Sequence, residues 1–592
     1  MNQWPDSSKS PAEPASPAWR HLLLLGVVAA CLFFVGLGRL PLLEPDEGRN
    51  AEVAREMAVG GDWITPHFDS LPYLDKPALY FWLVAGSFRM FGASEWAARM
   101  PSALAALATL LLAWFLARRM SGRAASLGAG IVLAASPLFV IFARQVIFDM
   151  TLAFFVTLAM TCFWLVEESR FTRPWLELVL FASSGLAAIT KGPVGFLLPF
   201  LSILAYEAIR GRMHDLKKLR WGRGLAVFCA ASLPWFLAVS IRHPDFPRYA
   251  FWDESLLRFA SGHAHRGGGP FYYIPVFLGG FLPWSFLLVF VAWNRRRRWK
   301  ELRQEGSRPT VFLLAWVGVI FLFFSISQSK LPGYVLPATI PLSILMAQAW
   351  REVSEGDRRP DWLTAGFAAL MLLGLLTAAS PQLLRVAALQ HRAAEKLPPA
   401  TLAMLAPSLL YSGMILVALG ILGRHLARHT RGRTAWWTTL ATLALVFPLL
   451  LLRWIAPLRS YAAADSSREL AETIQASSER DLPVYAYHYF RTGLPFYLGR
   501  PVTLVTADGA ETTSNYVVSR YDRLQHQQSS AGGAIFTSDA QLEARARSTP
   551  LLVLVRDGQA AALTGLIAGL EPLWTSWQYS VWETPGQETP AR

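Results

Sequence analysis

Charged residues are scarce in this chain. Asp, Glu, Lys and Arg together make up 16% of the 592 residues, whereas 53% are hydrophobic and 13% are aromatic. Water-soluble domains carry about 25% charged residues, so this composition excludes an ordinary soluble protein. It predicts a polytopic membrane protein instead.

Cysteines are nearly absent, and internal repeats are missing. The chain holds 3 cysteines, Cys31, Cys162 and Cys229. All of them fall in apolar segments, which excludes a disulfide framework and a cysteine-rich metal site. The sequence has no repeat of fixed period and no second copy of the polar cluster at 44–49. This argues against a transporter built from two matching halves.

Apolar runs long enough to cross a bilayer recur along most of the chain. They lie at 21–39, 100–117, 124–143, 147–166, 175–190, 193–209, 224–241, 271–293, 310–327, 334–350, 362–380, 407–423 and 434–452. Because a span needs about 20 mostly apolar residues, we expect about 13 transmembrane helices. Lys191-Gly192-Pro193 interrupts the stretch from 175 to 209, which is either a hairpin or a single broken helix.

The positions of Lys and Arg predict the orientation. Basic residues concentrate in the loops at 118–123, 167–174, 209–223, 294–308, 351–360 and 424–433, including the run Arg295–Arg298. Such loops face the cytoplasm, so we expect a cytoplasmic N-terminus and an external C-terminus. The net charge of +14 then reflects topology and attraction to anionic lipid. No basic stripe alternates with aromatic residues, so we expect no nucleic-acid binding.

The two ends of the chain differ from the middle. Residues 1–19 are polar and rich in Pro and Ser, which predicts a disordered cytoplasmic tail. The following apolar segment lacks a small-residue cleavage site, so we expect a retained helix. We expect a membrane domain over 20–456, with outer loops at 40–99 and 242–270. In 457–592, strand patterns at 484–487, 502–505, 551–555 and 577–582 alternate with helical patterns at 467–477 and after Gln559, which predicts an external α/β domain.

A dense polar cluster follows the first apolar segment. Glu44–Arg49 carries charges of both signs, and Asp75–Pro77 follows about thirty residues later in the same expected outer loop. Between them, an amphipathic helical pattern over 51–58 predicts a helix in the membrane interface. Charges of both signs at this place suit a site for an anionic lipid head group and a polar acceptor.

Asp46 and Arg49 allow two interpretations. Asp46 is either a helix N-cap, which needs a short side chain bearing an oxygen, or a catalytic carboxylate, and the two roles are compatible. Arg49 argues against a capping box, which requires Glu or Gln at that position. Spaced one helical turn apart, Asp46 and Arg49 either pair with each other or meet a sugar and a phosphate.

Further ionisable residues lie at the ends of expected spans. Asp149 lies between the third and fourth spans, where charged groups are costly and mark function; a salt bridge with Arg144 is the alternative. Lys76 and Lys330 either hold an anion or extend to the interface without a specific role.

The outer loop at 243–273 contains two closely spaced histidines. His263 and His265 are either ligands of a metal, together with a distant carboxylate such as Asp75, or exposed imidazoles. The glycines Gly267–Gly269 favour a mobile loop that closes over bound lipid.

Seven blocks in this order resemble the aminoarabinose transferase family of bacterial inner membranes, which is related to the protein O-mannosyltransferases. The blocks are Glu44–Arg49, Asp75–Pro77, Arg144–Asp149, Thr190–Pro193, Pro270–Tyr273, Ser329–Pro337 and Leu494–Pro501. Their number and order make the resemblance specific, whereas a single block would be weak.

The resemblance implies a fold and an activity. The fold is a polytopic α-helical C-type glycosyltransferase fold with a C-terminal periplasmic α/β domain. The activity is transfer of a sugar, 4-amino-4-deoxy-L-arabinose, from a polyprenyl phosphate such as undecaprenyl phosphate to lipid A, a lipopolysaccharide modification linked to polymyxin resistance. The alternatives are another sugar, a protein hydroxyl or another glycolipid as acceptor, and lipid transport.

The resemblance also implies roles for individual residues. The implied catalytic pair is Asp46 and Asp149, and the implied metal ligands are Asp75 and His265. His265 is a substitute candidate, because Ser255 follows Glu254 where the family has a histidine. The alternatives for the cofactor are therefore zinc and no cofactor. The implied substrate-binding residues are Glu47, Arg49, Lys76, Arg258, Lys330 and Tyr334.

The chemistry of the leaving group agrees with these roles. A departing polyprenyl phosphate gains negative charge at the interface, where Lys76 and Arg49 would stabilise it. A phosphate acceptor needs no strong base, whereas a hydroxyl acceptor needs a carboxylate to take its proton. The role of Asp46 therefore depends on the acceptor.

Overall fold

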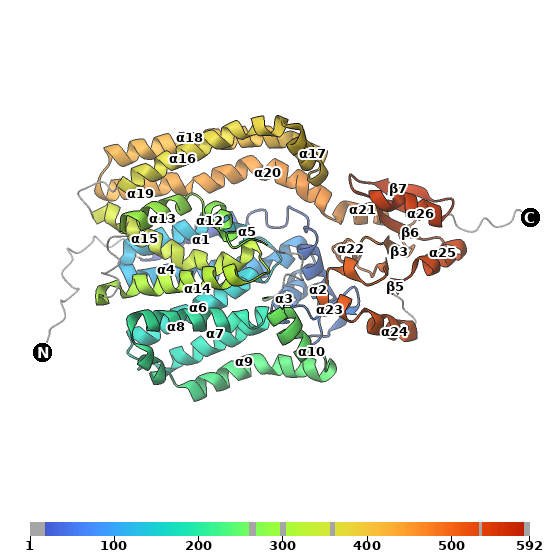
Figure 1. The fold of residues 1–592 in the computed structure, drawn as a ribbon, viewed down its shortest axis with the longest axis horizontal. Helices are drawn as coiled ribbons and strands as arrows, with labels where there is room; N and C mark the ends of the chain where they lie inside the picture. The colour runs from blue at the N-terminus through green and yellow to red at the C-terminus, as the bar shows by residue number, and fades with distance from the viewer. Residues whose placement is uncertain are drawn as a thin grey trace, which may run out of the picture.

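The computed structural model of the protein describes residues 18–257, 259, 268–295, 304–355, 361–531 and 535–584. Figure 1 shows long helices, up to α20, side by side on the left and a smaller α/β part at one end of them on the right. The short helices α2 and α23 lie where the two parts meet. The expected tail at 1–19 lies outside the described residues except for its last two positions.

The first part of the chain is almost entirely helical. Its helices are α1 (Ala18–Ala29), α2 (Asp46–Gly60), α3 (Leu79–Phe91), α4 (Glu95–Ala134), α5 (Pro137–Ala143), α6 (Asp149–Glu168), α7 (Pro174–Lys191), α8 (Val194–Arg210), α9 (Trp221–Arg242), α10 (Phe246–Arg248), α12 (Tyr273–Gly280), α13 (Trp284–Arg295), α14 (Arg308–Ile326), α15 (Thr339–Glu355), α16 (Asp361–Ala379), α17 (Ala387–Lys396), α18 (Pro399–His429), α19 (Gly432–Ala444) and α20 (Val446–Asp465). A π-helical turn, η3 (Tyr249–Leu257), follows α10, and a 3-10 segment, η6 (Pro332–Ala338), precedes α15.

Many of these helices are membrane spans. Among the described residues, 7 helical segments are long and apolar enough to cross a bilayer, or 8 when α12 and α13, which meet at 112°, count as one bent span. The expected count of about 13 is larger because several expected ranges lie on helices that are short, bent or joined end to end, such as α1, α12 and α4. Each expected range nevertheless lies mostly on helix. The protein is a multi-pass membrane protein.

Two glycines mark points where the chain turns back. Glu47 bonds both Arg99 and the backbone of Val146, so these residues lie together and the chain between them must run out and return. Gly122, inside α4, has the non-helical angles φ 86 and ψ −173, which separates the two spans expected there.

Gly192 ends α7, and a Cβ on Gly195 would lie 2.2 Å from the carbonyl carbon of Ala187. Residues eight apart in one helix are about 12 Å apart, so α7 and α8 form a hairpin.

The C-terminal part is a six-stranded mixed sheet with helices. The strand order is β5-β4-β3-β6-β8-β7, parallel from β5 to β6 and antiparallel from β6 to β7. The strands are β3 (Val484–Tyr487), β4 (Thr503–Val505), β5 (Phe536–Thr537), β6 (Leu552–Arg556), β7 (Glu571–Thr575) and β8 (Tyr579–Glu583), and the helices are α21 (Arg468–Ala476), α22 (Leu494–Leu498), α23 (Asn515–Ser519), α24 (Tyr521–Ala531), α25 (Asp539–Ser548) and α26 (Ala560–Leu566). The expected α/β character is confirmed, whereas β5 and β7 were not expected.

The parallel strands of the sheet are buried on both faces, as such strands usually are. Val553 and Val555 of β6 pack with α25 and α26, while Leu552 and Leu554 point to the other face. That second face shares one hydrophobic cluster with α2, α3 and the turn before α6, whose members include Val53, Phe81 and Phe148. The α/β part is therefore packed directly onto the outer loop of the first helices.

Candidate functional site

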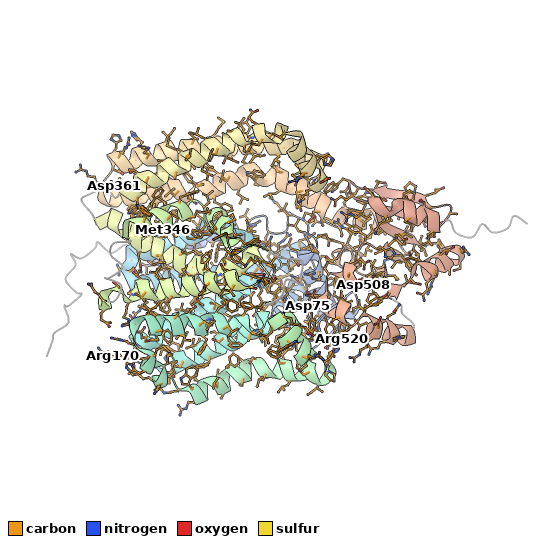
Figure 2. The ribbon with its side chains drawn as sticks, viewed as in Figure 1. Asp75, Arg170, Met346, Asp361, Asp508 and Arg520 are labelled. Atoms are coloured by element: carbon orange, nitrogen blue, oxygen red, sulfur yellow. The ribbon has the colours of Figure 1, made fainter. Side chains whose placement is uncertain are left out.

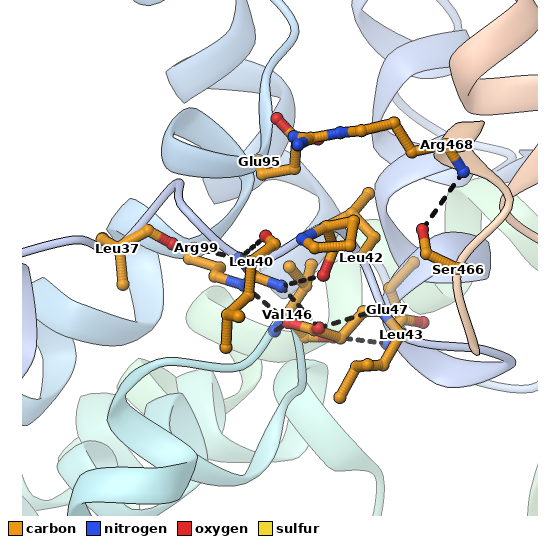
Figure 3. Close-up of polar contacts among 12 residues, drawn as sticks. Leu37, Leu40, Leu42, Leu43, Glu47, Glu95, Arg99, Val146, Ser466 and Arg468 are labelled. Carbon is orange, nitrogen blue, oxygen red and sulfur yellow. Dashed lines mark hydrogen bonds and ion pairs between the residues drawn. The ribbon is translucent and has the colours of Figure 1, made fainter. Parts of the chain in front are cut away.

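A buried ion pair organises the polar cluster after the first helix (Figure 3). Glu47 accepts hydrogen bonds from Arg99 Nε at 2.9 Å and Arg99 Nη2 at 2.7 Å. Arg99 also donates to three carbonyl groups in the segment 37–41. Both side chains are at most 5% exposed. The pair fixes the start of α2 against α4.

The same glutamate joins α2 to the start of α6. Its Oε1 accepts from the backbone N–H of Val146 at 2.9 Å, and Asn50 of α2 donates to the carbonyl of Val146 at 2.8 Å. Asp46 is the first residue of α2 and Asp149 the first residue of α6. The two expected catalytic carboxylates therefore lie at helix N-termini that Glu47 and Asn50 hold together, where the helix dipole stabilises negative charge. We interpret Glu47, whose oxygens are engaged within the protein, as a positioning residue.

Asp46 does not cap α2. Pro45 precedes the helix, and no side chain accepts a hydrogen bond at this cap. Asp46 instead pairs with Arg49, one turn further on, as one of the two interpretations of the sequence predicted. The Asp46 side chain is 40% exposed and that of Arg49 is 7% exposed. The carboxylate is thus open to a substrate while its cation is held by the protein.

Arg49 is surrounded by groups that stabilise its charge. Its Nη1 donates to the hydroxyl and, at 3.4 Å, to the carbonyl of Thr513. Its guanidinium carbon lies 5.6 Å from the centre of the Tyr73 ring, within range of a cation–π contact. Burial acts to lower the pKa of Arg49, but Tyr73, Asp46 and Asp75 outweigh burial and raise that pKa. Arg49 therefore remains a cation.

Asp149 pairs with a residue that the sequence reasoning did not select. Lys191, at the end of α7, donates to Asp149 Oδ1 at 2.6 Å, and its Nζ lies 4.6 Å from the centre of the Tyr334 ring. The alternative partner, Arg144, donates to the carbonyls of Leu32 and Val35 instead. Asp149, Lys191 and Tyr334 thus form a compact group on the helical part.

Asp75 faces the α/β part rather than an open site. It accepts hydrogen bonds from the Tyr249 hydroxyl and from the backbone N–H groups of Asn515 and Tyr516, at 3.1 and 2.8 Å. Both of its oxygens are engaged, and the described residues contain no group of three His, Cys, Asp or Glu side chains arranged to hold a metal. His265, the second expected ligand, lies outside the described residues, as does Arg258.

Lys76 lies beside this junction and keeps a carboxylate partner. Its Nζ is 2.5 Å from Glu254 Oε1 and donates to the carbonyl of Asp75 at 2.9 Å. The Asn515 side-chain amide donates to the other oxygen of Glu254 at 3.1 Å. Lys76 is 21% exposed, so its ammonium is both positioned and accessible.

Lys330 differs from Lys76. Its ammonium donates to the carbonyls of Phe324, Ser325 and Ser327, at 3.1, 2.8 and 2.6 Å. An ammonium has three N–H donors, so all of them satisfy carbonyl groups at the end of α14. Lys330 is only 4% exposed. We therefore interpret it as a helix C-cap.

Several residues of this site were missed from the sequence. Lys191 and Arg99 carry a detectable signal, because each is a charge beside or within an apolar stretch. Thr513 and Asn515 carry none, because they lie between 261 and 464 residues from the groups they contact. Only the packing of the α/β part onto α2 brings them together.

A hydrophobic cavity of about 300 Å³ lies elsewhere, between α7, α8 and α9. Its lining is apolar apart from Ser184 and includes Phe181, Phe196 and Phe228. None of the polar residues described above lines it.

Known proteins are similar to this chain in sequence and in fold. Residues 19–250 match the family model described as dolichyl-phosphate-mannose-protein mannosyltransferase. The chain is 33% identical over 358 residues to undecaprenyl phosphate-alpha-4-amino-4-deoxy-L-arabinose arabinosyl transferase 1 of Pseudomonas fluorescens, covering 60% of this chain and 62% of that protein. It is 35% identical to the corresponding transferase of Pseudomonas aeruginosa, covering 55% of this chain and 59% of that one. The chain thus spans about three fifths of the length of these relatives.

A solved structure matches over nearly the whole chain. ArnT from Cupriavidus metallidurans bound to undecaprenyl phosphate aligns with a TM-score of 0.81 and 25% identity, covering 98% of this chain and 100% of that one. The fold is therefore the C-type glycosyltransferase fold with a C-terminal mixed α/β sheet. The chain is thus similar in sequence to undecaprenyl phosphate-aminoarabinose arabinosyltransferases and similar in fold to ArnT.

Proposed function

We propose that this protein is a glycosyltransferase that moves 4-amino-4-deoxy-L-arabinose from undecaprenyl phosphate to lipid A. The observation that carries the proposal is the arrangement of Asp46 and Asp149 at two clamped helix N-termini, with the cations Arg49 and Lys76 on the same side of the molecule. The names of the relatives and the undecaprenyl phosphate in the solved ArnT structure support the choice of donor and acceptor.

The reaction replaces one bond at the sugar. An acceptor oxygen attacks the anomeric carbon, the bond from this carbon to the phosphate oxygen breaks, and undecaprenyl phosphate leaves with the electron pair. Lys76 and Arg49 stabilise the charge that develops on the phosphate. This charge is larger in the transition state than in the bound donor, so the two cations accelerate the step rather than only bind the donor.

The two carboxylates take different parts. Asp46 is half-exposed, so it is the group that meets the acceptor, and it accepts the proton when the acceptor is a hydroxyl. Asp149 is buried and paired with Lys191, so it orients the sugar from the helical side. Because the oxygens of Asp75 are engaged, we derive no step through a metal ion.

We propose that the site faces the periplasm and that the protein lies in the bacterial inner membrane. The α/β part lies at one end of the helices, whereas Arg170, in one of the basic loops, lies at the opposite end (Figure 2). Basic loops face the cytoplasm, so the site and the α/β part, which begins after α20 ends at Asp465, are periplasmic. Both proposed substrates are lipids that reach the site from the membrane.

A second function rests on the mannosyltransferase family model. Its match covers 19–250, which includes α2, Lys76 and the Asp149–Lys191 pair. The helical part therefore also suits transfer of a polyprenyl-linked sugar to a protein hydroxyl, and Asp46 would then act as the base.

The test reconstitutes the purified protein with the undecaprenyl-phosphate-linked sugar and lipid A. We expect a new lipid A species whose mass is increased by one aminoarabinose residue, and its absence with Asp46→Asn. A parallel reaction with an unstructured Ser/Thr-rich protein replaces lipid A. Sugar on that protein and none on lipid A would select the second function.

A further inference from the structure

We propose that the 510–516 segment of the α/β part completes the donor-phosphate site, with Thr513 and Asn515 as positioning residues for the two cations. This inference rests on the proposed function, because it assigns the cations Arg49 and Lys76 to the donor phosphate. It makes the α/β part a component of the site and not an appended domain.

Thr513 fixes the direction of the Arg49 guanidinium. Nη1 donates to Thr513, through both its hydroxyl and its carbonyl, and Nη2 pairs with Asp46. The remaining donor atom, Nε, is buried and has no hydrogen-bond partner within the described residues. A planar guanidinium that is hydrogen-bonded through both Nη atoms has a single orientation. Thr513 therefore fixes the position of the positively charged group.

Thr513, which contacts Arg49, has a left-handed backbone conformation. Its φ of 57° and ψ of 21° place a β-branched residue in the left-handed region, which such residues rarely adopt. Hydrogen bonds inside the segment hold it there, from the N–H groups of Thr512 and Thr513 to the carbonyls of Gly509 and Ala510, at 3.1 and 3.0 Å. Backbone strain of this kind persists where the surrounding structure imposes it and collects at functional sites.

Asn515 acts on the second cation through Glu254. The amide donates to Glu254 Oε2 while Glu254 Oε1 meets Lys76, so the carboxylate bridges the α/β part and the ammonium. The backbone N–H of Asn515 also donates to Asp75, the neighbour of Lys76. A single residue of the α/β part, Asn515, therefore contacts both Glu254, the partner of Lys76, and Asp75, its neighbour in the chain.

Independent contacts keep the segment in register with the helical part. Arg520, just beyond it, pairs with Asp245 at 2.6 Å, and Figure 2 shows Arg520 and Asp75 close to the boundary between the two parts. The Tyr516 and Tyr249 rings meet edge to face, with centroids 5.1 Å apart. A small shift of the α/β part would thus move both cations together.

The test measures binding of undecaprenyl phosphate without sugar to the full-length protein in detergent, together with KM and kcat for transfer. Thr513→Val removes the hydroxyl but keeps the branched shape, so the backbone cost is unchanged, whereas Thr513→Ser keeps the hydroxyl. Asn515→Leu removes the amide. Thr564→Val, on the exposed side of α26, is the matched control for loss of a threonine hydroxyl in the same part of the chain.

We expect Thr513→Val and Asn515→Leu to raise the Kd for undecaprenyl phosphate and the KM for the donor by about 5-fold or more, since hydrogen bonds to charged groups contribute strongly. The KM for the acceptor and the thermal midpoint should stay unchanged, and Thr513→Ser and Thr564→Val should resemble the wild type. An unchanged Kd in both Thr513→Val and Asn515→Leu would overturn the inference, as would equal losses in Thr513→Val and Thr513→Ser.

The binding arm separates this inference from the proposed function. A wild-type protein that binds undecaprenyl phosphate but transfers no sugar to lipid A would refute the proposed function, while the Kd values of the variants would still decide the role of the segment. If Thr513→Val unfolds, the Kd of Asn515→Leu decides it.

Discussion

The two halves of the site are built in different ways. Asp149, Lys191 and Tyr334 come from the helical part alone, and the Asp149 and Lys191 side chains are only 6% and 13% exposed. Asp46 and Lys76, at the junction with the α/β part, are more exposed and depend on that part for their setting. The buried half is a preset ion pair that salt screens weakly, whereas the junction half is open to solvent, ions and substrates. We propose that the helical part sets the position of the sugar and that the junction sets the contacts to the donor phosphate.

The largest expected effect is on turnover when either carboxylate loses its charge. We expect Asp46→Asn to lower kcat by about 10²- to 10⁴-fold, the range of general acid–base catalysis, with an unchanged thermal midpoint because Asp46 is half-exposed. Asp149→Asn should lower kcat similarly and also destabilise the fold, because it leaves Lys191 without its partner. Sugar transfer to lipid A, followed by mass spectrometry, measures both. Wild-type turnover in Asp46→Asn would remove it from the reaction.

The next effect concerns the clamp that holds the two carboxylates together. Arg99→Leu leaves Glu47 buried without its cation, so we expect a loss of about 3–5 kcal/mol in the free energy of unfolding. The exposed pair Arg119–Glu168 supplies the control, and Arg119→Leu should cost at most about 1 kcal/mol. Denaturant unfolding followed by tryptophan fluorescence compares the two. Equal losses would show that the clamp is no more important than a surface pair.

Features made by residues close together in the chain were predictable from the sequence, whereas contacts between distant residues were not. Apolar length predicted the helices, and short strand-like runs predicted β3, β4, β6 and β8. The strand β5 has two residues and β7 contains Pro572, so neither gives a strand pattern. Asp46 and Arg49 lie one turn apart on one helix, and their pairing was predictable. Asp149–Lys191 and Lys76–Glu254 are separated by 42 and 178 residues, so only the tertiary packing determines them.

A smaller effect separates the two lysines that looked alike in the sequence. Lys76→Ala should raise the KM for the donor roughly 10- to 150-fold, since a charge-assisted contact contributes about 1.5–3 kcal/mol, and leave the KM for the acceptor unchanged. Lys330→Met should instead lower the thermal midpoint, because three carbonyl groups lose their donors, with little change in donor KM. A donor KM that rises as much in Lys330→Met as in Lys76→Ala would return Lys330 to the phosphate site.

The last expected effect is a pH dependence of stability at the junction between the two parts. Burial and the nearby carboxylates of Glu52 and Asp69 raise the pKa of Glu56 to about 9, from 4.5. The folded protein therefore keeps a proton that the unfolded chain releases, so this contribution to stability is complete below pH 4.5 and is lost as the pH rises toward 9. Asp69 also accepts the N–H of Val502, which places this titration under the α/β part.

Replacing Glu56 tests that assignment. Glu56→Gln keeps a hydrogen-bonding side chain without a titrating proton, so we expect the thermal midpoint to fall less steeply between pH 5.5 and about pH 9 than in the wild type. Glu472→Gln, which changes an exposed carboxylate on α21, should leave the slope unaltered. If Glu56→Gln retains the wild-type slope, the junction does not titrate through this residue. The contrast with the buried Asp149–Lys191 half would then rest on exposure and salt screening alone.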